Sequence, residues 1–233
     1  MKIGAILAAG GKGIRLGNQT PKPFILLNHH PLIYYSLKVL SASALVDYIL
    51  VVVEREHIAY CQREIVEKYR FTKVDKVVEG GKERQDSVYN GLKELHPGTE
   101  LVLIHDGARP FVSQQLIEET ILVAQEVGAA IPGVSPTDTI KSINDGQWIE
   151  ETLDRDSLIM IQTPQVFKYD LLKDAYEKAY QDNFYATDDA LLIRRLGGSV
   201  KLVKGDYGNI KVTFPYDLKI AEKVLNVRRG KRL

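Results

Sequence analysis

Short apolar runs rich in β-branched residues alternate with longer segments of helical period along most of the chain. Each run is long enough for a strand buried on both faces, and each following segment is long enough for a crossover helix. This alternation predicts an α/β fold built on a parallel, doubly wound, Rossmann-like sheet. The predicted strands are residues 2–8, 48–53, 74–78, 101–105, 129–133 and 199–204. The predicted helices are residues 31–42, 55–69, 84–95, 114–127, 170–181, 188–196 and 216–227.

The alternation of strands and helices is interrupted between residues 135 and 168, where the chain consists of the short extended pieces PTDTIKSI, GQWIEETL and LIMIQTPQVF. The turn-like NDG at 144–146 joins the first two pieces, which predicts a β-hairpin that projects as an arm at about 137–160. Such an arm exposes Ile143, Trp148 and Ile149 unless a second subunit covers them, so we expect a homodimer. No repeat, linker or low-complexity segment interrupts the sequence, which predicts a single domain over residues 1–233.

Composition indicates which partners the protein can bind and in which compartment it resides. The formal net charge is +1 and the pI about 7.8, so no overall field attracts nucleic acid or an anionic membrane. The single cysteine, Cys61, excludes an intramolecular disulfide and favours a reducing compartment. No apolar run is long enough to span a membrane, and strand-like KIGAILAA begins without a signal-peptide cleavage pattern. We expect a cytoplasmic protein that binds neither nucleic acid nor membrane.

The first predicted strand leads into LAAGGKGIRLGNQTPK at residues 7–22, which combines four glycines with three cations. Glycine lets the backbone pass close to a ligand, and exposed N–H groups at a strand-to-helix turn bind oxyanions, so this loop is predicted to bind phosphate. It does not fit the dinucleotide fingerprint, because Leu16 stands where the third glycine belongs. It is not a Walker A loop, since no glycine precedes Gly11-Lys12 at the required spacing and no Ser or Thr follows the lysine.

Two further loops follow predicted strands and carry residues suited to a nucleotide. EGGKERQDSVYNGL (79–92) places two glycines and Ser87 where a base or a phosphate can approach the backbone. LVLIHDGARPF (101–111) ends a buried strand near Asp106 and Arg109, and a carboxylate there can hold Mg²⁺ or a ribose hydroxyl. The alternative for these two residues is a structural Asp–Arg pair. Ligands of open α/β sheets bind at the carboxyl ends of the strands, so these loops should share one site.

Two cations stand in later segments, Arg155 in TLDRDSL and Lys211 in GNIKVTFP. Threonine hydroxyls recur beside these loops, in DTIK, QTPQ and ATDDA, and hydroxyls near cations can contact a phosphate or a polyol. The sequence has no Ser-His-Asp order, no HExxH, no zinc spacing and no close carboxylate pair. An excess of loop cations suits phosphoryl or nucleotidyl transfer, in which the substrate phosphate is itself the nucleophile.

Taken in order, LAAGGKGIRLG…PK, GGKERQDSV, HDGARPF, DTIK, DR, QTPQ, TDDA and NIKVT resemble the 2-C-methyl-D-erythritol 4-phosphate cytidylyltransferases of the non-mevalonate isoprenoid pathway. The likeness spans residues 3 to about 222. It implies a nucleotidyltransferase sheet on which CTP and methylerythritol phosphate react to give the CDP-alcohol and pyrophosphate, with Mg²⁺ as cofactor. It also implies a homodimer in which the projecting arm completes the neighbour's site.

The resemblance implies a role for each matching residue. Arg15 and Lys22 would neutralise charge that grows on the α-phosphate, while Lys211 and Arg155 of the partner subunit would position the alcohol phosphate. Asp106 is the candidate magnesium ligand, with the CTP phosphates as the alternative holders of the ion. The positions implied to bind the nucleotide are Ala8, Ala9, Gly10, Gly81, Ser87, Asp106 and Gly107. The positions implied to form the polyol-phosphate pocket are Arg109, Thr139, Thr163 and Thr187.

Two departures from the family pattern lie near the base. Pro23 stands where the family commonly has glutamine, and Lys82 stands where it often has an acidic residue. Neither departure changes the four implied catalytic cations, so the implied chemistry is unaffected and only base selectivity is less constrained.

Three alternative functions stay open. A ribitol-5-phosphate cytidylyltransferase shares many of these motifs but more often has Ser-Val where this chain has Gly107-Ala108. A sugar-1-phosphate nucleotidylyltransferase would usually have a second metal-binding aspartate where this chain has Lys211. A catalytically inactive nucleotide-binding regulator would be expected to have lost Arg15, Lys22 or Lys211, and all three are present.

Overall fold

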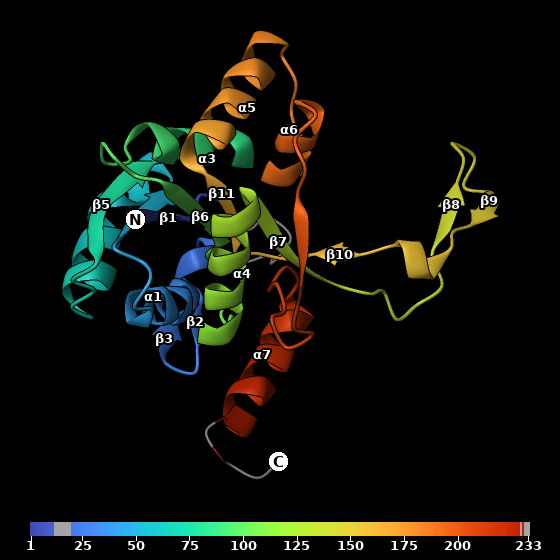
Figure 1. Cartoon of the computed structure of the whole chain (residues 1–233). Coiled ribbons are helices and arrows are strands. Elements are labelled where there is room, and N and C mark those ends of the chain that lie inside the picture. The colour runs from blue at the N-terminus through green and yellow to red at the C-terminus, as the bar shows by residue number, and fades with distance from the viewer. Residues whose placement is uncertain (12–19, 229, 231–233) are drawn as a thin grey trace.

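A computed structural model describes residues 1–11, 20–228 and 230 of the chain. Within these residues an eight-stranded sheet runs in the order β10-β7-β11-β6-β1-β4-β5, and β12 also pairs with β7 (Figure 1). Its strands are β1 (Ile3–Ala8), β4 (Tyr48–Val53), β5 (Val74–Glu79), β6 (Leu101–Asp106), β7 (Ala129–Val134), β10 (Met160–Ile161), β11 (Gln165–Lys168) and β12 (Lys201–Lys204). Two short hairpins are β2 (Leu26–Leu27) with β3 (His30–Pro31), and β8 (Lys141–Ile143) with β9 (Ile149–Thr152).

The helices of the described residues lie between these strands. The α-helices are α1 (Leu32–Ala42), α2 (Ile58–Tyr60), α3 (Arg84–Lys93), α4 (Gln114–Val127), α5 (Tyr169–Gln181), α6 (Asp189–Arg195) and α7 (Pro215–Arg228). Short 3-10 helices are η2 (Lys22–Phe24), η3 (Arg55–His57) and η5 (Arg155–Ser157), and a π-helix is η4 (Cys61–Glu67). Ser113 caps α4 by accepting a hydrogen bond of 3.1 Å from the N–H of Leu116, a contact typical of a helix start.

Helices cover both faces of the sheet, because successive side chains of a strand point to opposite faces. On one face Leu7 of β1 belongs to a buried cluster with α1, η4 and α4, including Leu37, Ile65 and Ile117. On the other face Ile6 belongs to a cluster with α3, α5 and α6. Full burial of one such aliphatic side chain is worth about 1.5–3 kcal/mol, so the two layers fix the strand ends that carry the loops. The predicted doubly wound α/β architecture is confirmed.

The sheet is largely parallel, as predicted, but two of its strands run antiparallel to their neighbours. The pairings of β1 with β4 and β6, of β4 with β5 and of β7 with β12 are parallel. However, β11 lies between β6 and β7 and runs antiparallel to both, and β10 is also antiparallel to β7. The segment that returns from the arm therefore enters the sheet, whereas the sequence assigned it to the hairpin region. A short apolar extended run does not reveal the direction of its partner.

The predicted helix at 55–69 is also different in detail. The segment is helical but divides into η3, α2 and η4, so its hydrogen bonding passes from 3-10 through α to π geometry. The buried side chains of Cys61 and Ile65 still face the core, which is the part that the apolar period predicts.

The predicted arm is present as the β8–β9 hairpin, which stands away from the rest of the chain at the far end of β10 (Figure 1). Its apolar side chains are exposed as expected: Ile143 by 61%, Trp148 by 75% and Ile149 by 64%. Arg155 lies in η5 at the base of this arm.

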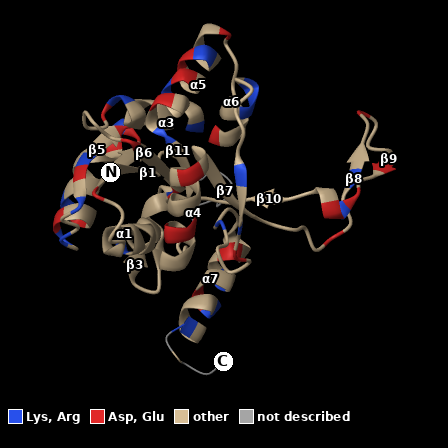
Figure 2. Ribbon diagram, viewed as in Figure 1, with Lys and Arg blue, Asp and Glu red and all other residues tan. Residues whose placement is uncertain are grey.

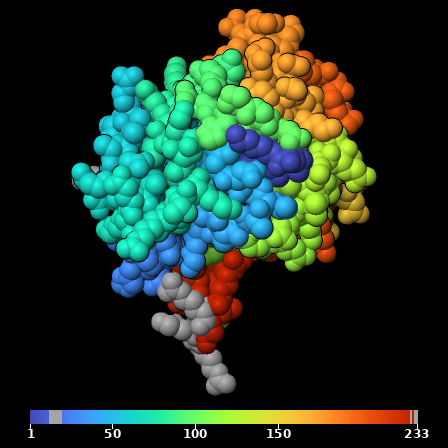
Figure 3. Space-filling view, turned by 60° about the vertical axis from the view of Figure 1, so that its left-hand side comes forward, coloured from blue at the N-terminus to red at the C-terminus, as the bar shows by residue number. Residues whose placement is uncertain are grey.

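The two ends of the body are formed by α5 and α7. The space-filling view shows α7 extending away from the body on the side opposite α5 (Figure 3). Cationic and anionic residues are interspersed along both helices, in keeping with a net charge of +1 (Figure 2). None of the helices in the described part of the chain combines the length and the apolar character that crossing a membrane requires.

Candidate active site

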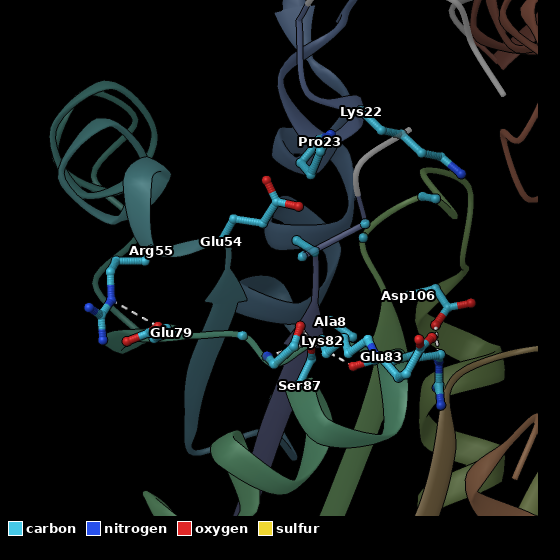
Figure 4. Close-up of a pocket in the computed structure, with 18 of the residues that line it drawn as sticks. Ala8, Lys22, Pro23, Glu54, Arg55, Glu79, Lys82, Glu83, Ser87 and Asp106 are labelled. Atoms are coloured by element: carbon cyan, nitrogen blue, oxygen red, sulfur yellow. Dashed lines mark hydrogen bonds and ion pairs between the residues drawn. The ribbon is translucent and has the colours of Figure 1, made fainter. Parts of the chain in front are cut away.

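A cavity of about 750 Å³ opens at the carboxyl ends of β1, β4, β5 and β6 (Figure 4). Each of these strands ends in a loop that reaches the cavity, and this edge is where open α/β sheets bind ligands. Arg55 and Glu79, paired at 2.9 Å, lie at one end of the cavity, and Asp106 lies at the other end (Figure 4).

Nine residues predicted for the site line this cavity, although they come from five separate segments of the chain. They are Ala8, Ala9, Gly10, Lys22, Gly81, Ser87, Asp106, Gly107 and Lys211. Arg15 lies outside the described residues. Ala8 and Asp106 are adjacent partners in the parallel pairing of β1 with β6, so the loop after β1 and the loop after β6 begin side by side.

The glycines of this wall are required by close packing. A Cβ atom at Gly81 would lie 2.2 Å from Cβ of Asp86, and one at Gly107 would lie 3.1 Å from Cβ of Ala9. The first distance excludes a side chain at Gly81 unless the backbone moves, and the second is a tight contact that would require a small shift of Ala9. The glycine wall therefore presents backbone atoms to a ligand, as expected for a loop that a base or phosphate approaches closely.

Ser87 holds the shape of the second glycine loop. Its hydroxyl oxygen accepts a hydrogen bond of 3.1 Å from the N–H of Gly81 and donates one of 3.1 Å to the carbonyl of Glu83. Glu83 and Asp86 form a capping box at the start of α3, so the first turn of the helix and the loop before it form one unit.

Asp106 is the centre of charge in the cavity. Lys211 Nζ lies 2.7 Å from Oδ2 of Asp106, and Arg84 Nε lies 3.1 Å from Oδ1. Burial of this carboxyl raises its pKa, but the two cations outweigh burial and hold the pKa well below its usual range. The sequence left open a structural Asp–Arg pair here, and the arginine that pairs with Asp106 is Arg84.

Arg84 lines the cavity and pairs with Asp106, and the sequence did not single it out. It lies within GGKERQDSV, but nothing in that motif separates a cation that faces the cavity from one that faces solvent. Glu54, Arg55 and Glu56 also line the cavity, from the segment after β4, and the sequence had no motif there.

Arg109 stabilises the loop that carries Lys211. Its buried guanidinium donates hydrogen bonds from Nη1 to the carbonyl of Asn209 at 2.7 Å and from Nη2 to the carbonyl of Ile161 at 3.3 Å. The N–H of Val212 donates to the carbonyl of Ala108 at 2.9 Å. The loop after β6 and the loop after β12 are therefore joined on both sides of Lys211.

Thr163 lies beneath Asp106, with its hydroxyl buried. Its Oγ1 accepts a hydrogen bond of 3.1 Å from the N–H of Asp106 and lies 3.0 Å from Nδ1 of His105. Nε2 of His105 lies 3.1 Å from the carbonyl of Arg109, which can only accept, so the neutral ring carries its proton on Nε2 and accepts from Thr163 at Nδ1. Burial lowers the pKa of His105 to about 4.

Five of the described predicted residues do not line the cavity of a single chain: Arg109 and Thr163, which lie buried behind it, and Thr139, Arg155 and Thr187. Arg155 and Thr139 lie on the arm, where Arg155 Nη1 donates 2.9 Å to the carbonyl of Thr137. Thr187 is exposed just before α6. Within one chain, neither the two arm residues nor Thr187 contacts the cavity where the alcohol phosphate is expected.

Carboxylates that could approach a metal ion are present at both ends of the cavity. Among the described residues, Glu54, Glu56 and His57 place three possible ligand atoms within 4.8 Å of one another. Asp106 is the predicted ligand, and each of its two oxygens is already paired with a cation.

A cavity at the carboxyl edge of a doubly wound sheet, with glycine walls and with lysines from three loops, is suited to a nucleoside triphosphate and an anionic acceptor. This fold and this site define a nucleotidyltransferase.

The comparisons with known proteins narrow that class. Residues 3–227 match the family described as IspD: 2-C-methyl-D-erythritol 4-phosphate cytidylyltransferase. A protein of that name from Clostridium botulinum (strain Eklund 17B / Type B) is 47% identical over 224 residues, which are 96% of this chain and 99% of the relative. The chain belongs to the family of 2-C-methyl-D-erythritol 4-phosphate cytidylyltransferases.

Solved structures agree with this assignment. The 4-diphosphocytidyl-2C-methyl-D-erythritol synthase of Anaerococcus prevotii DSM 20548 has a TM-score of 0.85 and 33% identity, covering 97% of this chain and 98% of its own. The 2-C-methyl-D-erythritol 4-phosphate cytidylyltransferase of Thermus thermophilus has a TM-score of 0.80 and 30% identity, covering 97% and 100%. The resemblance in the motifs is confirmed, and the ribitol phosphate alternative is not favoured.

Proposed function

We propose that the cavity at the carboxyl edge is where this chain joins CTP to 2-C-methyl-D-erythritol 4-phosphate in the non-mevalonate isoprenoid pathway. The products are 4-diphosphocytidyl-2-C-methyl-D-erythritol and pyrophosphate, and the reaction takes place in the cytoplasm. The observation that carries the proposal is the convergence of Lys22, Lys211 and the glycine loops on one cavity.

The reaction is an in-line displacement at the α-phosphorus of CTP. An oxygen of the acceptor phosphate forms the new P–O bond while the bond to the β-phosphate breaks, and the electron pair leaves with pyrophosphate. Because the acceptor is already an anion, neither a protein nucleophile nor a strong base is needed. The protein supplies position and positive charge.

The glycine and alanine wall binds the cytosine. Ala8, Ala9 and Gly81 leave room for a pyrimidine, and backbone groups can read its amino edge. Ser87 contributes by holding Gly81 in place. Base selection through the backbone explains how Pro23 and Lys82 can depart from the family pattern without changing the nucleotide.

One pair of cations acts on the phosphates of CTP, and a second pair binds the acceptor phosphate. Arg15 and Lys22 stabilise the charge that develops on the α-phosphate and the leaving pyrophosphate. Lys211 holds the acceptor phosphate together with Arg155 of the partner subunit, because in its own chain Arg155 lies on the arm and does not line the cavity. This requires a homodimer, and the exposed apolar side chains of the arm support one.

Magnesium fits this site as an ion carried mainly by the nucleotide. Mg²⁺ in such sites takes one or two carboxylates together with phosphate oxygens, and here Asp106 is the carboxylate at the phosphate end of the cavity. Since both oxygens of Asp106 are paired with cations, the triphosphate would supply most of the ligands. The bound ion would neutralise part of the triphosphate charge.

The test is a pyrophosphate-release assay of the purified protein with each nucleoside triphosphate and each alcohol phosphate. Turnover should be fastest with CTP and methylerythritol phosphate, should be weak with ribitol 5-phosphate, and should depend on added Mg²⁺. Comparable turnover with ATP or GTP would show that the small-residue wall does not select a pyrimidine. Absence of turnover with methylerythritol phosphate would reject the function.

A further inference from the structure

The first turn of α3 contains a cation that connects two carboxylates from distant parts of the chain. Arg84 Nε lies 3.1 Å from Oδ1 of Asp106 at the end of β6, and Arg84 Nη1 lies 2.9 Å from Oδ2 of Asp189 at the start of α6. The Asp189 side chain is 1% exposed and that of Asp106 is 10% exposed, so both are largely removed from water.

Each of the two aspartates that Arg84 contacts also has a second partner. On the cavity side, the second oxygen of Asp106 pairs with Lys211. On the core side, the second carboxylate oxygen of Asp189, Oδ1, accepts a hydrogen bond from the hydroxyl of Tyr176 in α5. The order Tyr176, Asp189, Arg84, Asp106 and Lys211 therefore runs from the buried face of α5 into the cavity.

A charge removed from water is costly unless an opposite charge lies beside it. Burial lowers the pKa of the Arg84 guanidinium, but Asp189 and Asp106 outweigh it and raise the pKa above its ordinary value. Removing one member of a buried ion pair leaves its partner uncompensated, which is more costly than removing both. Arg84 thus has two carboxylates to compensate, and Asp106 is left with Lys211 alone if Arg84 is lost.

The first turn of α3 is also fixed to the chain around α6. Gln85 Nε2 donates 3.0 Å to the carbonyl of Phe184, and Gln85 Oε1 accepts 2.8 Å from the N–H of Ala186. Gln85 makes these contacts to the same segment that carries Asp189, but no contact with Asp106 is among its hydrogen bonds in the described structure. It therefore provides a matched comparison for Arg84.

We propose that Arg84 is a positioning residue of the transfer reaction, because its guanidinium fixes the carboxylate of Asp106 and thereby holds Lys211 in the cavity. The proposal rests on the proposed function, which assigns Lys211 to the acceptor phosphate. Arg84 pairs with Oδ1 of Asp106 while Lys211 pairs with Oδ2, so that Lys211 can turn its remaining N–H donors to a phosphate. A lysine in place of Arg84 has one ammonium group and cannot hold both carboxylates with separate nitrogens.

The test is a double-mutant cycle between Arg84→Met and Lys211→Ala, read in the kinetics of purified, folded protein. In the wild-type background, Arg84→Met should raise KM for the alcohol phosphate and lower kcat, each by roughly 10-fold. In the Lys211→Ala background the same substitution should change kcat/KM by less than about 3-fold, since its effect passes through Lys211. Arg84→Lys should recover only part of the loss.

Two further variants separate position from stability. Gln85→Leu should lower the midpoint of thermal unfolding while leaving KM for the alcohol phosphate within about 2-fold of wild type. If Arg84→Met does not fold, the double variant Arg84→Met/Asp189→Asn removes both charges of the Arg84–Asp189 pair, leaves Asp106 paired with Lys211, and should show the same kinetic pattern.

Each outcome decides one question. Additive effects of Arg84→Met and Lys211→Ala, or full recovery by Arg84→Lys, would overturn the positioning role while leaving the proposed function intact. A wild-type protein without transferase activity would instead reject the proposed function, before the cycle is measured.

Discussion

Lys211 Nζ lies 2.7 Å from Oδ2 of Asp106, so a cation from the loop after β12 is paired with the last residue of β6 inside the cavity. Because the pKa of Asp106 is held well below its usual range, with Arg84 and Lys211 outweighing burial, this carboxylate stays ionised at every pH at which the protein would be assayed. A lysine held in this way is oriented before the substrates bind. Preorganised charge of this kind is the main source of catalysis for a transferase that forms no covalent bond between protein and substrate.

Lys22→Ala should lower kcat by roughly 100- to 1000-fold, the scale of removing one preorganised donor from a developing charge. Most of the loss should appear in kcat, because the charge that Lys22 is proposed to stabilise grows during transfer. Steady-state kinetics of pyrophosphate release measure it, and Lys219→Ala, an exposed lysine on α7, is the control. A variant that keeps kcat and only raises KM for CTP would show that Lys22 binds the ground state.

Arg155→Ala should raise KM for the alcohol phosphate, since this phosphate is charged before and after attack. The loss of a charge-assisted hydrogen bond corresponds to about 1.5–3 kcal/mol, or roughly 10- to 150-fold in kcat/KM. The measurement is kcat/KM with the alcohol phosphate varied at saturating CTP. An unchanged KM would remove Arg155 from the acceptor site.

The subunit that supplies Arg155 can be identified by mixing. A heterodimer of one Lys22→Ala subunit and one Arg155→Ala subunit contains one intact site and one doubly damaged site if Arg155 crosses the interface. Mixed variants should therefore regain activity beyond that of either variant alone. If heterodimers form and remain inactive, Arg155 acts within its own chain.

The secondary structure was largely predictable, because its causes are local. The apolar period along 101–106 is that of a strand buried on both faces, and Ser113 has the side chain of a helix cap. The glycine loops were predictable as ligand-binding loops, since they follow strands whose carboxyl ends share one edge. Both predictions depend on neighbours in sequence.

The features that were not predicted depend on partners far apart in sequence. The direction of β11 is set by its pairing with β6 and β7, and nothing within QTPQVF distinguishes that pairing from a longer arm. Arg84 meets Asp189 only because α3 and α6 pack on the same face of the sheet. The hydrogen bonds from Arg109 to the backbone carbonyls of Asn209 and Ile161 were likewise not predicted, because both partners lie more than fifty residues further along the chain.

The double substitution Trp148→Ser/Ile149→Ser on the arm should weaken the proposed dimer without unfolding the body, since both side chains are exposed in the single chain. Sedimentation velocity over a range of protein concentrations measures dissociation, and circular dichroism checks the fold. Turnover should fall as dimers dissociate, whereas binding of CTP should persist. Full turnover by a monomeric variant would count against a site shared between subunits.

Stability should depend on pH through His105, whose pKa falls from 6.5 to about 4 because burial disfavours the charged ring. As the pH falls from 6.5 towards 4, the unfolded chain protonates this residue while the folded chain does not, so stability is lost, by about 3 kcal/mol in total. The substitution His105→Gln tests this dependence, because glutamine cannot take up that proton. Urea unfolding should find the wild type more stable than the variant at pH 8, where the lost contacts of His105 dominate. The difference in unfolding free energy between the two proteins should shrink below pH 6.5. Carboxylates that titrate in the same range are common to both proteins and cancel. A difference that stays constant down to pH 4.5 would mean that His105 takes up its proton as readily in the folded protein as in the unfolded chain, so that its pKa is not lowered.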